Sequence, residues 1–235
     1  MGVRDTGPAM RNAVPDEVQA GRPAPLGAML ARRSVLIAGL ACLWPAVPAL
    51  AQPLAALPEI SPQARVLRDT LPGKAVLGAA GVTPAITELV DFNAPDWRRS
   101  ARDMHELLAG NPGLAYAIVQ APRFDVKSVE AARIALAVLQ MAPARFGEFY
   151  QALAEREGEI DGVKAVEAAR DLGLDAFKVF RAANQPEITT SLTKAVEFSS
   201  ALRLLSTPAY VIGNRLLSGY ADLERKRALI AEVKG

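Results

Sequence analysis

The sequence predicts an α/β fold into which a block of helices is inserted. Residues 85–92 form a near-continuous apolar and β-branched run, typical of a strand buried on both faces. Apolar side chains recur at helical spacing between residues 97 and 110, and a second apolar run follows at residues 114–119, so we expect a strand–helix–strand unit with a right-handed crossover. Every signal between residues 128 and 206 is helical, and a hairpin is predicted at residues 209–218.

Shorter elements complete the predicted order. Ser61 and Pro62 suit the N-cap and first turn of a helix. Residues 75–78 are a candidate short strand, and a final helix is expected from Asp222. The chain is therefore divided into an N-terminal extension with a signal peptide (1–51), a linker and N-terminal helix (52–70), an α/β domain in two pieces (71–127 and 206–235) and an inserted helical subdomain (128–205).

The composition excludes several classes of function. Lys and Arg number 27 against 25 Asp and Glu, so the basic excess that a nucleic-acid-binding surface needs is absent. One Cys and one His exclude zinc sites built from these residues and any internal disulfide. We expect no metal, no cofactor and no nucleic-acid partner, and His105 is predicted to be a solvent-facing helix residue.

Residues 30–51 have the order of a secretory signal peptide. Arg32 and Arg33 precede an apolar run at residues 35–44, and Ala51 ends a small-x-small cleavage site. The run is too short to cross ~30 Å of hydrocarbon, which takes about 20 apolar residues. Cleavage after Ala51 would remove Cys42 and release the protein into the periplasm, with no membrane contact afterwards.

Three points about this leader stay open. Arg32 and Arg33 also suit a twin-arginine (Tat) export signal, although ordinary Sec signals carry Arg pairs too. Translation starts at Met1 or at Met29. Cys42 is a competing candidate for lipoprotein attachment, but Gly39 occupies the position where such sites usually carry Leu.

The predicted order of elements is that of a thioredoxin fold with a helical insertion. Residues 88–101 resemble the active-site segment of the periplasmic DsbA-type thiol:disulfide interchange proteins, usually Glu-Phe-Phe-Asp-Tyr-x-Cys-Pro-x-Cys. Residues 128–133 resemble the start of that family's first inserted helix, and residues 207–219 resemble its cis-proline strand and hairpin. This resemblance covers about residues 71–234 and implies that the α/β domain is thioredoxin-like.

The sequence departs from the family at the catalytic positions. Where the family has its two cysteines, this chain has Ala94 and Trp97, in the turn Ala94-Pro95-Asp96-Trp97. Thiol–disulfide exchange needs a thiolate to attack a disulfide sulfur, which neither a methyl group nor an indole can do. Because no cysteine follows residue 51, the sequence predicts a redox-inactive member of a redox family.

Two residues near this turn have alternative roles. Glu88 aligns with the acid that the family keeps beneath its reactive cysteine, where burial without a partner would raise its pKa. It would otherwise lie on an exposed strand end, paired with an Arg. Trp97 continues the apolar stripe of its helix, which indicates core packing, while its place in the first turn also allows partial exposure.

Thr207 and Pro208 carry the binding function that the resemblance implies. In DsbA-type proteins this proline is cis, and the backbone before it pairs with an extended peptide, which needs no thiol. With Ala94 and Trp97 as an apolar floor, we expect a groove for an extended peptide or a periplasmic partner protein. The alternatives are a non-thiol enzyme of the glutathione-linked transferase or isomerase type, for which Ala94 supplies no nucleophile, and an oligomeric structural subunit.

Overall fold

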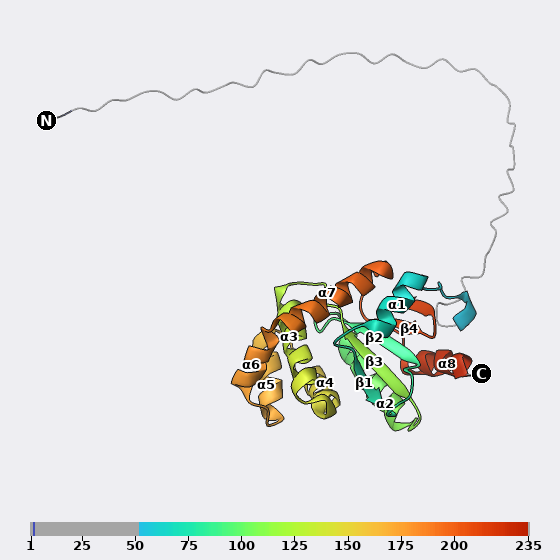
Figure 1. Cartoon of the computed structure of the whole chain (residues 1–235), viewed down its shortest axis with the longest axis horizontal. Coiled ribbons are helices and arrows are strands. Elements are labelled where there is room, and N and C mark those ends of the chain that lie inside the picture. Colours follow the sequence, from blue (N-terminus) through green and yellow to red (C-terminus); the bar gives the residue numbers. More distant parts are fainter. Residues whose placement is uncertain (1, 3–51, 235) are drawn as a thin grey trace, which may run out of the picture. The chain divides into compact units, whose positions relative to one another are not determined.

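A five-stranded mixed sheet lies at the centre of the computed structural model, which describes Gly2 and residues 52–234 (Figure 1). Its strands are β1 (Ala75–Gly78), β2 (Ile86–Val90), β3 (Ala115–Gln120), β4 (Ala209–Ile212) and β5 (Arg215–Ser218), in the order β1-β3-β2-β4-β5. β2 is parallel to β3, and every other neighbouring pair is antiparallel. The predicted signal peptide and Cys42 lie outside the described residues.

Eight α-helices surround the sheet in this described part. They are α1 (Pro62–Thr70), α2 (Trp97–Ala109), α3 (Val126–Met141), α4 (Phe146–Ala154), α5 (Gly162–Asp171), α6 (Ala176–Ala183), α7 (Pro186–Ala201) and α8 (Leu223–Lys234). Two 3-10 turns, η2 (Leu54–Ala56) and η3 (Pro143–Arg145), complete the elements. The predicted N-cap is confirmed, because Ser61 Oγ accepts a hydrogen bond from the Ala64 amide at 3.1 Å. None of these described helices combines the length and the apolar character needed to cross a bilayer.

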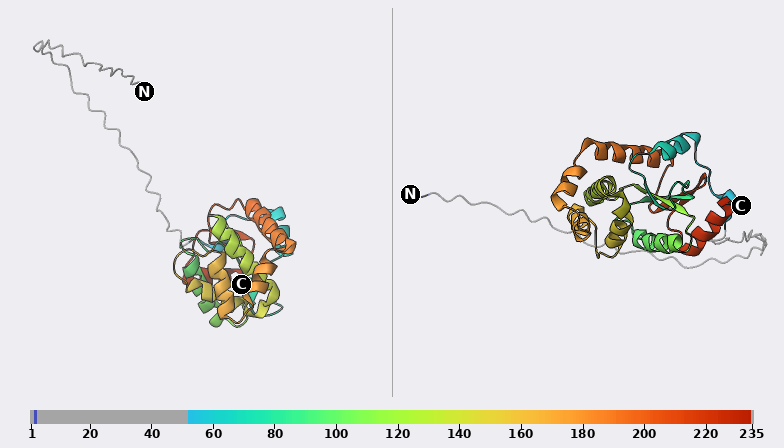
Figure 2. Two further views of the ribbon diagram at one scale, coloured as in Figure 1. Left: turned by 90° about the vertical axis from the view of Figure 1, so that its left-hand side faces the viewer. Right: turned by 60° about the horizontal axis from the view of Figure 1, so that its bottom comes forward.

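The alternation of side chains along β2 divides the core between the two faces of the sheet. Ile86 and Val90 belong to a cluster that includes residues of α2, α4 and α8. Leu89 points to the opposite face, into a cluster with residues of α1 and α7. The second panel of Figure 2 shows these helix layers above and below the strands. β2 is buried at every position, as the apolar run predicts.

The predicted helical insertion is present, and α7 connects it to the sheet. Ile188 and Leu192, in the first half of α7, pack against α3. Phe198, in the second half, packs against the sheet with Leu89. The helix therefore belongs to both parts of the molecule, although the sequence boundaries at residues 128 and 205 assigned it to the insertion alone.

Two helix ends differ from the prediction for local reasons. α3 begins at Val126 instead of Ser128, because Asp125 is its N-cap and accepts the Ser128 amide at 2.9 Å. α7 ends at Ala201 instead of continuing to residue 205, since Arg203 adopts a left-handed conformation with φ of 52°. The second change frees residues 204–208 to form a loop before β4.

Candidate binding site at the carboxyl edge of the sheet

The turn that corresponds to the family's active site connects β2 to α2. The Ala94 amide donates to the carbonyl of Asp91 at 3.1 Å, and Ala94 is 1% exposed. Pro95 is exposed, and the half-buried Asp96 carboxylate pairs with Arg99 at 3.2 Å. The turn therefore presents a proline ring and an ion pair to solvent, and its small apolar residue lies inside.

Trp97 lies entirely in the core, so the alternative of partial exposure is wrong. Its ring centroid lies 5.2 Å from that of Phe92 and 6.0 Å from that of Tyr150, with both pairs in edge geometry. The Arg98 guanidinium lies 5.0 Å from the Trp97 ring centroid. Tyr150 belongs to α4, so the helical insertion buries the indole that stands at the second cysteine position.

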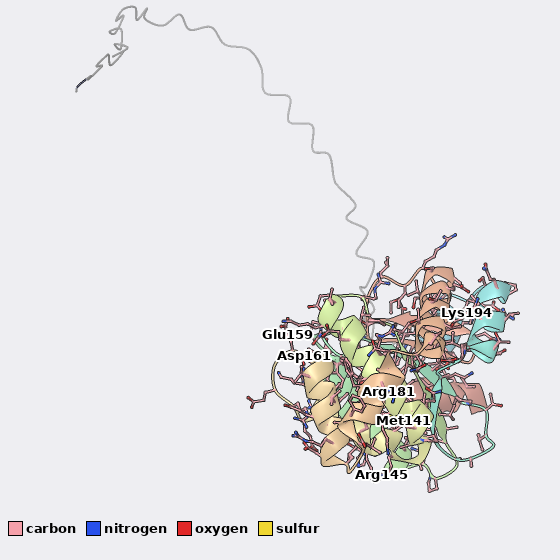
Figure 3. All side chains as sticks on the ribbon, turned by 60° about the vertical axis from the view of Figure 1, so that its left-hand side comes forward. Met141, Arg145, Glu159, Asp161, Arg181 and Lys194 are labelled. Atoms are coloured by element: carbon pink, nitrogen blue, oxygen red, sulfur yellow. The ribbon has the colours of Figure 1, made fainter. Side chains whose placement is uncertain are left out.

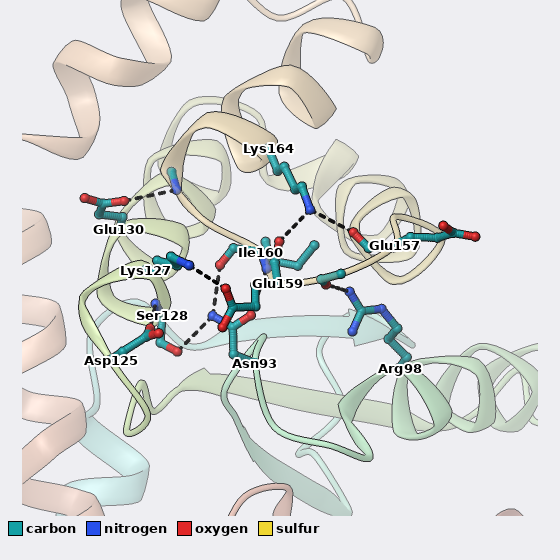
Figure 4. A network of polar contacts seen from close by, with 12 residues as sticks. Asn93, Arg98, Asp125, Lys127, Ser128, Glu130, Glu157, Glu159, Ile160 and Lys164 are labelled. Atoms are coloured by element: carbon teal, nitrogen blue, oxygen red, sulfur yellow. Dashed lines mark hydrogen bonds and ion pairs between the residues drawn. The ribbon is translucent and has the colours of Figure 1, made fainter.

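Polar side chains beside the turn bind the insertion to the sheet domain, as Figure 4 shows. Asn93 donates to Ser128 Oγ at 3.1 Å and to the carbonyl of Ile160 at 3.0 Å, and accepts the Ile160 amide at 2.7 Å. Arg98 donates through Nε and Nη2 to the carbonyl of Arg156 at 3.1 and 2.8 Å. The turn is thus held from both sides by the segment between α4 and α5.

Asp91 fixes the chain after β3, a role that sequence reasoning missed. The carboxylate is 1% exposed and accepts from Ser128 Oγ at 2.7 Å, from the Asn93 amide at 2.8 Å and from the Phe124 amide at 3.1 Å. It also accepts the Arg123 amide. Two signals in the sequence mark it: it is a carboxylate directly after an apolar strand, and it matches the Asp of the family's active-site segment.

Glu88 is a buried acid, so the alternative of an exposed strand end is wrong. Its side chain is 0% exposed, and Oε2 accepts from Tyr116 Oη at 2.9 Å. Oε1 has no hydrogen-bond partner among the described residues. Burial raises the pKa of Glu88, and the Lys226 ammonium and the Tyr116 hydrogen bond oppose that rise.

A fully buried lysine, Lys226, lies close enough to Glu88 to influence its pKa, and sequence reasoning did not predict its burial. Lys226 Nζ of α8 donates to Ser100 Oγ at 3.0 Å and to Asp103 Oδ2 at 3.1 Å. Asp103 also accepts from Tyr220 Oη at 2.8 Å, and burial together with this carboxylate raises the pKa of Tyr220 to about 12. Tyr220 is therefore a hydrogen-bond donor at neutral pH.

The Thr207–Pro208 peptide bond is cis, as the resemblance implies. The ladder between β2 and β4 ends at the pair Leu89 and Ala209, so Thr207 lies just before β4 at the end of the sheet where β2 leads into the turn. Within the described part of the chain, no main-chain hydrogen bond engages the Thr207 amide or carbonyl, and its buried hydroxyl has no partner. The main-chain groups of Thr207, a residue that is 6% exposed, are thus unpaired in this part of the chain.

Comparison with known proteins identifies the family. Residues 80–231 match the family model described as DSBA-like thioredoxin domain. The chain belongs to this family. No curated protein sequence matches it.

Solved structures agree with this DSBA-like fold. A thioredoxin-like oxidoreductase from Silicibacter pomeroyi DSS-3 is 25% identical, with a TM-score of 0.66 over 71% of this chain and 97% of that chain. The catalytic domain of Proteus mirabilis ScsC is 22% identical, with a TM-score of 0.64 over 72% and 96%. A periplasmic thioredoxin-like protein from Salmonella enterica serovar Typhimurium is 20% identical, with a TM-score of 0.61 over 74% and 98%.

The DSBA-like edge around the cis-proline carries exposed apolar side chains that sequence reasoning missed. Leu205 is 86% exposed in the loop before Thr207, and Phe124 and Val126 are 56% and 72% exposed after β3. These segments lie at the carboxyl ends of β2 and β3, which share one edge because the strands are parallel. Phe124 and Leu205 lie in loops and Val126 is the first residue of α3, so no periodicity in the sequence marks these side chains as exposed.

The predicted groove needs a correction in its floor. The four predicted groove residues, Ala94, Trp97, Thr207 and Pro208, are all buried. The apolar side chains of Ala94, Trp97 and Pro208 are therefore not exposed to a ligand, and Thr207 offers only its backbone. The exposed apolar surface of this DSBA-like edge comes instead from Phe124, Val126 and Leu205. We call these three residues, with the Thr207 backbone, the cis-proline edge.

The DSBA-like site offers no accessible nucleophile at the turn. Ala94 and Trp97 cannot attack a substrate, and His105 is exposed on α2 without an ion-pair partner in the described part. Ser100 and Lys226 have the spacing of a serine–lysine pair, but both side chains are 0% exposed. The described residues include no group of three or more His, Cys, Asp or Glu arranged to hold a metal ion.

Proposed function

We propose that this chain is a redox-inactive DsbA-like protein that binds extended apolar segments of proteins in the periplasm. The observation that carries the proposal is the Thr207 backbone, which has no main-chain partner among the described residues and lies two residues from the exposed Leu205. An extended segment can pair with that backbone by β-augmentation and place apolar side chains on Phe124, Val126 and Leu205.

Redox inactivity follows from the chemistry of the turn. Exchange requires a thiolate and a mixed disulfide, and Ala94 and Trp97 stand at the two positions where the family places cysteines. Cys42 lies in the predicted signal peptide, which cleavage after Ala51 removes. The likeness to a periplasmic thioredoxin-like protein supports this compartment.

The expected affinity is modest. Burying ~200 Å² of apolar ligand surface at about 25 cal/mol/Å² contributes roughly 5 kcal/mol before the cost of association. We therefore expect dissociation constants in the micromolar range or weaker for isolated peptides. A partner protein that also contacts the helical insertion would bind more tightly.

The binding test uses dye-labelled apolar peptides and fluorescence anisotropy, because Trp97 is buried and does not report on a ligand. Leu205→Ser should weaken binding by about fivefold or more, and Phe177→Ser, on the helical insertion, should not change it. A second arm uses the same peptides with N-methyl groups at alternate residues, which removes pairing donors while it keeps the side chains. Equal binding by methylated and unmethylated peptides would refute pairing with the Thr207 backbone.

The redox test measures insulin reduction and thiol oxidation by the purified protein. We expect no turnover, and reproducible turnover by the purified chain that starts at Gln52 would contradict the proposal. N-terminal sequencing of the exported form tests cleavage before Gln52. Replacing Arg32 and Arg33 by Lys should stop export by the Tat route and leave Sec export intact.

A further inference from the structure

The helical insertion carries a second apolar surface, which shares no residue with the cis-proline edge. A groove of about 690 Å³ lies between α3, α5 and α6. Figure 3 brings this part of the insertion forward, with Arg181 of α6 and Asp161, the N-cap of α5, among the labelled residues. Ile134, Val166 and Ala183 contribute apolar side chains to its lining.

Three large apolar side chains along this groove are exposed to solvent. Phe177 and Phe180 lie three residues apart on α6 and are 69% and 57% exposed, and Val163 of α5 is 67% exposed. All three line the groove. Two exposed phenyl rings in register on one helix form a contiguous patch, which marks an interaction site more often than scattered single residues do.

The charges that line the groove are balanced in a regular way. Glu130 and Arg133 lie three residues apart on α3, and Glu167 and Arg170 lie three residues apart on α5. In both helices the acid comes first. The lining therefore has no net charge and offers little attraction to a strongly acidic or strongly basic partner.

Local contacts hold three of these four side chains. Glu130 accepts the Gly162 amide at 3.5 Å, and Arg133 donates to Thr189 Oγ1 at 3.1 Å. Glu167 lies 3.8 Å from the Arg156 guanidinium. These contacts hold the acidic and basic side chains in fixed positions on the folded surface.

We propose that the groove is the interface of a homodimer in which a second copy of this chain docks by the same face. A two-fold axis perpendicular to α5 packs this helix antiparallel against its own copy, and the same surface of each copy then forms the interface. With acid before base on α5, this arrangement places Glu167 beside Arg170 of the partner subunit, whereas a parallel arrangement would oppose like charges. Phe177 and Phe180 of each copy then enter the groove of the other.

The size of the patch sets the strength of the dimer. Phenylalanine side chains bury about 150–250 Å² each when fully covered, so covering the exposed parts of four rings removes several hundred Å² from water. Stable interfaces typically bury about 1,600 Å² in total. We therefore expect a dimer that dissociates at micromolar concentration. This inference uses no residue of the cis-proline edge and does not rest on the proposed function.

Sedimentation velocity of the full chain over a micromolar concentration series tests the dimer. The wild type should shift from monomer to dimer, and the double variant Phe177→Glu with Phe180→Glu should weaken association at least tenfold. Phe124→Glu is the matched control, because it exposes the same charge elsewhere; it should dimerise normally and lose peptide binding. Circular dichroism checks that each variant is folded.

A charge exchange tests the symmetry of the interface. Glu167→Arg and Arg170→Glu should each weaken the dimer severalfold, and the two together should restore it, because both copies then carry the exchanged pair. A wild-type chain that stays monomeric over the series, or dimers that the two Phe substitutions leave unchanged, would overturn the proposal. So would a double charge variant that associates no better than the single ones.

Discussion

The two segments that face each other at the carboxyl edge of the sheet differ in how they are held. The turn at Ala94 to Trp97 is buried under an aromatic cluster and bound on both sides by the insertion. The loop before Pro208 has an unpaired backbone at Thr207 and an almost fully exposed Leu205. The first segment is packed against the rest of the chain, although the buried Trp97 indole N–H has no hydrogen-bond partner among the described residues. The second segment has main-chain groups without a partner in the same part of the chain.

This difference separates two properties that the family combines at one site. A reactive thiol needs access and a lowered pKa, so the turn that carries it must stay open. Without the thiols, Trp97 fills the turn and connects the sheet domain to α4. In the proposed function, recognition of an extended segment depends on the backbone before the proline, where Thr207 has no main-chain hydrogen bond among the described residues.

The largest effect should come from the turn. Trp97→Ala removes a side chain that is 0% exposed and leaves a cavity between Phe92 and Tyr150, so we expect a loss of about 3–5 kcal/mol in the free energy of unfolding. Urea denaturation measures it. Phe177→Ala, at an exposed aromatic residue, should change stability by no more than about 0.5 kcal/mol. Equal losses in the two variants would show that Trp97 is not a core residue.

The second largest loss of stability should come from removing the hydrogen bonds between Asn93 and Ile160. Asn93→Ala leaves the amide and carbonyl of the buried Ile160 without partners, which costs about 1–3 kcal/mol. Hydrogen exchange should show faster exchange at residues 157–161, and urea denaturation gives the energy. Asn184→Ala is the matched control, because Asn184 makes one exposed hydrogen bond within its own helix turn. If the Ile160 amide were equally protected from hydrogen exchange in the variant and the wild type, Asn93 would not hold this segment.

Glu88 should give the stability a pH dependence with a definite sign. Burial raises its pKa in the folded state, so stability is greatest below the unfolded pKa of about 4.3 and falls as the pH rises through the folded pKa. The loss is about 1.4 kcal/mol for each pH unit that separates the two values. Glu88→Gln should remove this fall, and Glu155→Gln, an exposed control, should keep it. Parallel stability curves for Glu88→Gln and the wild type would contradict the assignment.

The smallest effect should come from the loop. The Thr207 hydroxyl is buried without a partner among the described residues, so Thr207→Val should raise the free energy of unfolding by up to about 1 kcal/mol. Peptide affinity should stay the same, because the pairing groups belong to the main chain. Thr193→Val, at an exposed helix position, is the control. A loss of both stability and binding would mean that the hydroxyl has a partner.

Sequence reasoning predicted what local patterns specify. The buried strand at residues 86–90, the hairpin around Gly213 and the Ser61 cap each depend on neighbours a few residues away. Helix ends were less certain, since Asp125 took the cap position expected near Ser128. The cis bond before Pro208 followed from a resemblance, because no spacing in the chain specifies it.

The site was predicted only in part, because its contacts join distant segments. The burial of Trp97 depends on Tyr150, which a helical pattern does not place. Glu88 could be called buried only once Tyr116 and Lys226 were known to lie beside it. The exposed Phe124 and Leu205 belong to loops, where no periodicity distinguishes an open side chain from a covered one.

The buried lysine has a consequence for how the protein is made. Asp103 and Ser100 are synthesised long before Lys226, 123 residues after Asp103 in the chain. At roughly 5–20 residues per second, about 6 to 25 s pass on the ribosome before the ammonium that balances this carboxylate exists. During that interval Ser100 and the partly exposed Asp103 lack the ammonium group that contacts both of them in the folded protein. We therefore expect this part of the core to be completed only after α8 has been made.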